Sequence, residues 1–114
     1  MDAVLTQIEP VLTNRTVILT LQNGVDTEDR IVARVHRDCV VGGIAYIYSK
    51  IAEPGVIDHY KKGAVAIGEM MGHHSARLLA IEDLFKQAKI PCQLADDIRR
   101  SKWEKLCWNC VFNP

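Results

Sequence analysis

The chain has 114 residues, of which 48% are hydrophobic and 25% are charged, and 14 Lys and Arg residues balance 14 Asp and Glu residues to a formal net charge of zero. These values are typical of one small globular domain or a piece of a larger protein, and they exclude a chain that is disordered by composition. The neutral balance argues against a dedicated nucleic-acid-binding domain, because such domains usually carry a basic excess.

The sequence also argues against a membrane or secreted protein. No apolar run approaches the ~18 residues that a transmembrane helix needs. Residues 1–5 contain no basic stretch followed by an apolar core, so they do not resemble a signal peptide. Without secretory features, cysteines are expected to be reduced thiols. These are Cys39, Cys92, Cys107 and Cys110. We therefore expect a cytoplasmic protein.

The first third of the chain has the pattern of an α/β fold. Apolar residues at helical spacing predict a helix over residues 2–9, ended by Pro10, and the β-branched run 16–21 predicts a buried parallel strand. A Gln-Asn-Gly turn follows, and Asp26 is a suitable N-cap for the next helix. Ligands bind α/β folds at such strand ends, but a turn that needs Asn and Gly for its backbone explains the tripeptide equally well.

Shorter turn spacing in the middle of the chain predicts antiparallel strands over residues 39–48, 56–61 and 64–68, added as a meander to the sheet edge. Gly42-Gly43 indicates a bulge or a close approach of the backbone. Residues 73–89 form the clearest amphipathic helix. Residues 92–94 are expected to be extended, and Asp96-Asp97 begins a terminal helix.

The terminal helix carries an unusual polar stripe. Lys105, Asn109 and Asn113 stand at i, i+4 and i+8, so they share one helical face. Unpaired buried polar groups each cost about 1–3 kcal/mol, so something polar should lie against this stripe. The residues around it are apolar and are expected to be buried: Trp103, Leu106, Cys107, Cys110 and Val111.

Each of these residues also has a structural explanation. Lys105 could be a surface lysine, and Asn109 and Asn113 could cap or bridge neighbouring loops. The Cys107-x-x-Cys110 pair could bind metal or act in redox chemistry, but no second ligand pair has zinc-like spacing. We expect core cysteines and no metal site.

The basic cluster near the start of the terminal helix also has two explanations, a solvated face or a contact with a cofactor phosphate or a partner domain. Its members are Arg99, Arg100 and Lys102. The solvated face is the expectation.

Five sequence features together resemble the ketopantoate reductase (2-dehydropantoate 2-reductase) family in their order and spacing. They are Leu21-Gln22-Asn23-Gly24, Gly42-Gly43, Pro54-Gly55 with His59, Ile67-Gly68, and the terminal pattern W-x-K-L-x-x-N-x-x-x-N-P over residues 103–114. The terminal pattern is the most specific. The resemblance implies an oxidoreductase that uses NADPH to reduce ketopantoate to pantoate in the pathway to pantothenate and coenzyme A.

The resemblance also implies roles for four residues. Lys105 matches the family's catalytic lysine, which hydrogen-bonds the ketone oxygen and acts as a general acid. Asn109 and Asn113 match the asparagines that bind the substrate's hydroxyl and carboxylate. Asn23 matches the asparagine of the strand-end turn beside the nicotinamide of the cofactor.

The implied fold is the second half of a Rossmann-like dinucleotide-binding domain with added antiparallel strands, over residues 1–94. Residues 95–114 would be the first helix of an all-helical C-terminal domain. No G-x-G occurs in this chain, so the glycine-rich phosphate loop of the family is absent from it. We therefore expect an internal fragment that is inactive by itself and that could form a homodimer through an open sheet edge.

Two other functions are compatible with the sequence. One is a reductase of the same fold that acts on another small 2-oxo acid. The other is non-catalytic: a small α/β module that acts by interaction, or a CxxC metal or redox protein. Bound zinc at the two terminal cysteines would favour the second.

Overall fold

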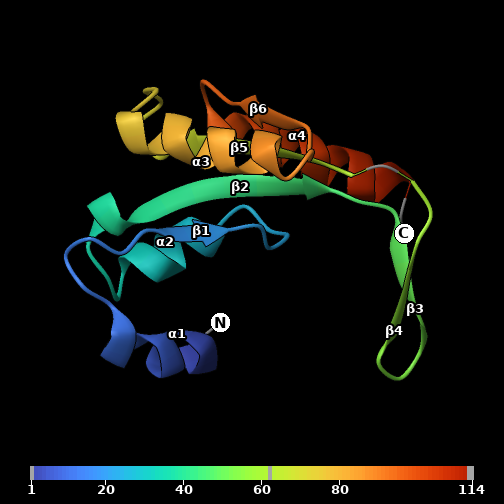
Figure 1. The fold of residues 1–114 in the computed structure, drawn as a ribbon, viewed down its shortest axis with the longest axis horizontal. Helices are drawn as coiled ribbons and strands as arrows, with labels where there is room; N and C mark the ends of the chain where they lie inside the picture. The colour runs from blue at the N-terminus through green and yellow to red at the C-terminus, as the bar shows by residue number, and fades with distance from the viewer. Residues whose placement is uncertain (1, 62, 113–114) are drawn as a thin grey trace.

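The computed structural model describes residues 2–61 and 63–112 as a mixed α/β fold (Figure 1). Its main sheet has the strand order β1-β2-β5-β6. The strands are β1 (Ile18–Thr20), β2 (Val40–Tyr46), β5 (Ala64–Glu69) and β6 (Cys92–Leu94). β1 is parallel to β2 and β5 is parallel to β6, whereas the central pair β2–β5 is antiparallel. The predicted α/β class is confirmed.

Helices join the parallel strands, as a parallel pair requires. α2 (Thr27–Val32) connects β1 to β2, and α3 (Ala76–Gln87) connects β5 to β6. The other helices are α1 (Asp2–Ile8), α4 (Ile98–Phe112) and the 3-10 turns η1 (Glu9–Val11) and η2 (Arg37–Cys39). Within the described ranges, no helix combines the length and the apolar character needed to cross a bilayer.

The core lies on both faces of β2, because successive side chains of a strand point to opposite faces. Val40 packs with Leu5 of α1 and Ile31 of α2. Its neighbour Val41 packs with Ile67 of β5 and Leu78 of α3. Further along, Ile44 packs with Ala66 and with Ile98 at the start of α4. β2 therefore holds the helices in place around the sheet.

The prediction of a meander on the sheet edge was wrong. β2 pairs directly with β5, with Tyr46 opposite Ala64. Between them, β3 (Ser49–Glu53) and β4 (Val56–His59) form a separate hairpin that extends away from the body of the molecule (Figure 1). Alternation in a sequence shows that residues are extended, but it does not select the partner of each strand.

Close backbone approach at Gly42-Gly43 was predicted and is confirmed. A Cβ on Gly43 would lie 2.6 Å from Leu21 Cδ2 and 3.0 Å from the carbonyl oxygen of Thr20. The register of β2 with β5 runs without interruption through both glycines, so they do not form a bulge. The missing side chain of Gly43 allows β1 and its following loop to lie directly against β2.

Gly68 of β5 allows the beginning of α4 to approach the sheet in the same way. A Cβ there would lie 2.9 Å from the carbonyl oxygen of Ala95 and 2.9 Å from Ile98 Cβ. We expect Gly68→Ala to lower the free energy of unfolding by about 1–3 kcal/mol, because overpacking at a backbone contact forces the helix away. Urea denaturation measures this loss. Ala52→Val, which adds bulk on the exposed strand β3, is the control and should change stability by less than about 0.5 kcal/mol.

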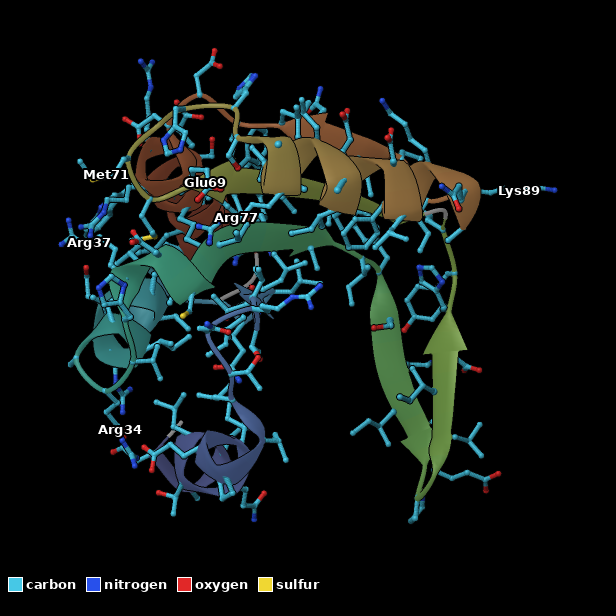
Figure 2. The ribbon with its side chains drawn as sticks, turned by 60° about the vertical axis from the view of Figure 1, so that its left-hand side comes forward. Arg34, Arg37, Glu69, Met71, Arg77 and Lys89 are labelled. Atoms are coloured by element: carbon cyan, nitrogen blue, oxygen red, sulfur yellow. The ribbon has the colours of Figure 1, made fainter. Side chains whose placement is uncertain are left out.

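A buried carboxylate ties β5 to the beginning of α3 (Figure 2). Glu69 is 3% exposed and accepts hydrogen bonds from Arg77 Nε at 2.7 Å, Arg77 Nη2 at 2.6 Å and Ser75 Oγ at 2.5 Å. Ser75 Oγ in turn accepts the backbone N–H of Leu78, which caps the helix. The hydrogen bonds from Arg77 hold the pKa of Glu69 below its ordinary value, although burial opposes them.

Candidate functional site

α4 faces the sheet with the side that carries its lysines. Ile98 and Lys102 are buried, and Lys105, Leu106 and Asn109 are half-buried. The predicted burial of the flanking apolar residues was wrong for Trp103, which is 56% exposed, and for Val111, which is 69% exposed. Cys107 and Cys110 are also exposed, so the expectation of core cysteines was wrong. Periodicity identified two faces of the helix, but it did not show which of them is buried.

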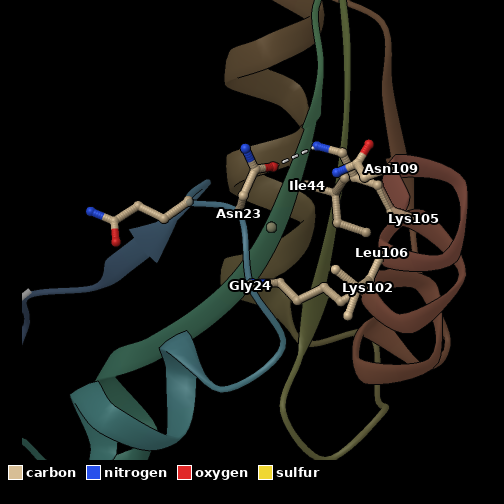
Figure 3. Close-up of a pocket in the computed structure, with 9 residues that line it drawn as sticks. Asn23, Gly24, Ile44, Lys102, Lys105, Leu106 and Asn109 are labelled. Carbon is tan, nitrogen blue, oxygen red and sulfur yellow. Dashed lines mark hydrogen bonds between the residues drawn. The ribbon is translucent and has the colours of Figure 1, made fainter. Parts of the chain in front are cut away.

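Lys105 meets two oxygen acceptors at the carboxyl ends of β1 and β2, and Figure 3 shows the first of them, Asn23. Its Nζ donates to Asn23 Oδ1 at 3.0 Å, across 82 positions in the sequence, and to the carbonyl oxygen of Ala45 at 2.6 Å. The ring centroid of Tyr46 lies 5.6 Å from the same nitrogen. For Lys105, the polar neighbours that the sequence led us to expect are present.

The surroundings of Lys105 make it a stronger acid than an ordinary lysine. Partial burial lowers its pKa, because the charged form loses hydration, and the nearby charge of Lys102 lowers the pKa further. In the part of the chain that the structure describes, no carboxylate lies within ion-pair distance of Lys105. The hydrogen-bond acceptors of its ammonium are therefore neutral protein oxygens.

A small open pocket surrounds this contact. It brings together Asn23 and Gly24 of the loop after β1 with Lys102, Lys105 and Asn109 of α4 (Figure 3). Gly24 has a φ of 121°, so the Gln-Asn-Gly turn does need a glycine. Three of the four predicted site residues thus line one pocket. The fourth, Asn113, lies outside the described residues.

The basic cluster makes specific contacts with α2 rather than a uniformly solvated face. Arg99 pairs with Asp29, and Lys102 pairs with Glu28. Lys102 and Glu28 have side chains that are each only 4% exposed, so the solvated-face prediction was wrong for Lys102. Arg100 is exposed and pairs with Glu104 on its own helix.

Sequence reasoning missed Glu28 and Lys102 as neighbours of the site. The available signals were weak. Glu28 lies in an acidic first turn, which a favourable helix dipole explains by itself, and Lys102 stands one helical turn before Lys105. Asp26 was predicted as an N-cap; it occupies that position, but its side chain makes no capping hydrogen bond. Over the described residues, no group of three or more His, Cys, Asp and Glu side chains could hold a metal ion.

Comparisons with known proteins show what the chain is similar to. A family model described as "Ketopantoate reductase PanE/ApbA" matches residues 1–72. The chain is 29% identical over 111 residues to a 2-dehydropantoate 2-reductase of Nostoc sp., covering 93% of this chain and 35% of that protein. It is also 29% identical over 130 residues to the enzyme of Mesorhizobium japonicum, covering 96% of this chain and 40% of that protein.

Solved structures share the fold. The crystal structure of 2-dehydropantoate 2-reductase from Geobacter metallireducens aligns with a TM-score of 0.87 and 33% identity, covering 98% of this chain and 38% of that one. A complex of D-mandelate dehydrogenase with NADH aligns with a TM-score of 0.85 at 22% identity, covering 95% of this chain and 36% of that one. The chain therefore spans between a third and two fifths of the length of these relatives.

Proposed function

The chain belongs to the ketopantoate reductase family, and from that premise we propose that it supplies part of the active site of an NADPH-dependent 2-dehydropantoate 2-reductase. The observation that carries the proposal is the hydrogen bond of Lys105 Nζ to Asn23 Oδ1 at 3.0 Å. It places a partly desolvated ammonium at the carboxyl ends of two parallel strands, where α/β folds bind their ligands.

In this proposal Lys105 is the general acid. Addition of hydride to the ketone carbon would build negative charge on the ketone oxygen, and a positioned ammonium can stabilise that charge and then donate its proton. An ammonium has three N–H donors, of which Asn23 Oδ1 and the Ala45 carbonyl engage two. We assign the third to the ketone oxygen. The lowered pKa of Lys105 favours this proton transfer.

The described residues fit the nicotinamide end of a dinucleotide and not its phosphates. Asn23 offers a side-chain amide beside the open turn at Gly24, opposite the ammonium of Lys105. When bound, the cofactor would supply the hydride. The phosphate loop is absent from this sequence, so the proposal assigns no phosphate contact to the chain.

Substrate binding is assigned to the next turns of α4. Asn109 lines the pocket four residues after Lys105, on the same helical face. Its amide can both donate and accept hydrogen bonds, as recognition of a hydroxyl and a carboxylate requires. Asn113 keeps its predicted role on the strength of the family resemblance alone.

The test is an assay of the longest natural polypeptide that contains this chain. Consumption of NADPH should depend on ketopantoate and should yield pantoate. Parallel assays with NADH and with an aromatic 2-oxo acid determine the cofactor and the substrate class. A purified, folded protein that oxidises neither cofactor with any 2-oxo acid would overturn the proposal.

Asn23→Ala should lower kcat/KM for ketopantoate by about 10- to 100-fold, because a hydrogen bond to a charged group contributes about 1.5–3 kcal/mol. Steady-state kinetics in both substrates measure the effect. Asn14→Ala, at an exposed position before β1, is the matched control and should leave kcat/KM unchanged. Equal kinetics of the two variants would remove Asn23 from the site.

Three further expectations remain predictions from the sequence. They are a cytoplasmic location, a homodimer formed through an open sheet edge, and a domain boundary between residues 94 and 95. β1 and β6 are the edges of the described main sheet.

A further inference from the structure

The most buried ion pair beside the site is the contact of Lys102 with Glu28. Lys102 Nζ donates to Glu28 Oε1, and both side chains are 4% exposed. The residues are 74 positions apart in sequence, so the pair joins α4 to the first turn of α2. A buried ion pair rarely contributes much net stability, because desolvation of the two charges offsets their attraction. A role beyond stability is therefore worth testing.

The sheet makes room for this pair beneath the site. A Cβ on Gly42 would lie 3.3 Å from Glu28 Oε1 and 3.0 Å from Ile98 Cγ1, so a side chain there would crowd both the carboxylate and the helix. Lys102 lines the same pocket as Lys105, whereas Glu28 does not line it. The cationic end of the pair therefore faces the site.

Three cations of α4 stand three residues apart along its contact with α2 and the loop before it. Arg99 meets the carboxylate of Asp29, Lys102 meets the carboxylate of Glu28, and Lys105 meets the neutral amide of Asn23. This order matches each of the first two cations with a carboxylate and leaves the third for a ligand.

We propose that Lys102 and Glu28 are positioning residues for Lys105: the pair fixes the turn of α4 that presents the Lys105 ammonium, and its cationic end sets the electric field at that ammonium. The significance of this field for catalysis rests on the role proposed above for Lys105. A field that favours release of the proton makes a better general acid near neutral pH.

The elements packed against Lys105 also bring other groups near its ammonium. On β2, Tyr46 lies beside the ammonium, and its own pKa is raised by burial and by the charge of Glu104. The loop after β1 contributes the neutral Asn23, which accepts a hydrogen bond from Lys105. Among the residues that the structure describes, Lys102 is the one whose charge lowers the pKa of Lys105.

The experiment is a pH titration of the Lys105 side-chain resonances by NMR in the chain itself, which needs neither cofactor nor substrate. The main variant combines Glu28→Gln with Lys102→Gln, which replaces the ion pair by two amides that can still hydrogen-bond. We expect the pKa of Lys105 to rise by about half a unit or more. An unchanged pKa would overturn the proposal.

Two companion variants distinguish an effect of the electric field on Lys105 from an effect of a loosened α4. Asp29→Asn combined with Arg99→Gln neutralises the pair one turn away and should leave the pKa of Lys105 unchanged; a rise as large as in the main variant would mean that loosening α4 is the cause. Glu28→Gln combined with Lys102→Arg keeps a permanent cation and removes its carboxylate. It should lower the pKa of Lys105 below that of the wild-type chain, whereas loosening would raise it.

The proposed function is tested separately, by the basic limb of the pH profile of kcat in the longest natural polypeptide. In the variant that combines Glu28→Gln with Lys102→Gln, this limb should move in the same direction as the pKa of Lys105. A titration that shifts while the limb stays fixed would remove Lys105 as the acid, and with it the catalytic significance of the pair. If the pKa of Lys105 does not shift in the titration, the positioning role of Lys102 and Glu28 is overturned, and the proposed function is not affected.

Discussion

Lys105→Ala should lower kcat for NADPH-dependent reduction of ketopantoate about a hundredfold or more, measured in the longest natural polypeptide that contains the chain. The variant removes the group proposed to hold the ketone oxygen and to supply its proton, and general acids usually contribute about 10²–10⁴-fold. Because binding of the substrate also depends on neighbouring asparagines, KM should change less than kcat.

Two controls support this measurement. Lys50→Ala removes an exposed lysine from strand β3 and should leave kcat unchanged. Lys105→Arg keeps a positive charge but replaces the compact ammonium by a planar group that does not release a proton near neutral pH, so it should not restore activity. If Lys105→Ala retains kcat within about threefold of the wild-type value while remaining folded, Lys105 is not the acid.

Glu69→Gln should lower the free energy of unfolding by about 2–4 kcal/mol at neutral pH. It weakens three hydrogen bonds to a buried carboxylate and leaves Arg77 without its ionised partner. The loss should be smaller than the largest losses seen when a fully buried ion pair is broken, because the Arg77 side chain is 31% exposed and water can reach it. Urea denaturation of the two proteins measures the difference.

The same pair should make stability dependent on acid pH. The pKa of Glu69 is lower in the folded chain than its ordinary value of 4.5, so its contribution is fully present above that value and is lost as pH falls through the folded value. The stability difference between wild type and Glu69→Gln should therefore shrink below about pH 4.5. Glu53→Gln, on the exposed strand β3, is the control. A difference that stays constant down to strongly acid pH would contradict the assignment.

The local sequence pattern was sufficient to predict most of the helices and strands. The β-branched run before Gln22 and the amphipathic run after Ser75 gave a strand and a helix, since burial on two faces and on one face leave different periodicities. Gly42-Gly43 indicated a close approach, because few other reasons place two glycines within a strand. The hairpin β3–β4 was misplaced, since extended residues do not specify their partners.

The sequence by itself determined that Lys105 and Asn109 share one face of a helix, because 3.6 residues per turn fixes that relation. Only the tertiary structure decided that this face is the inner one. On the inner face Lys102 pairs with Glu28 across 74 positions, whereas Trp103 and Val111 of the apolar face remain exposed. Local periodicity places residues on faces, whereas the burial of a face depends on the partner that the rest of the chain provides. In the same way, the resemblance implied that Lys105 and Asn23 both serve the active site, but only the fold shows that their side chains are in contact.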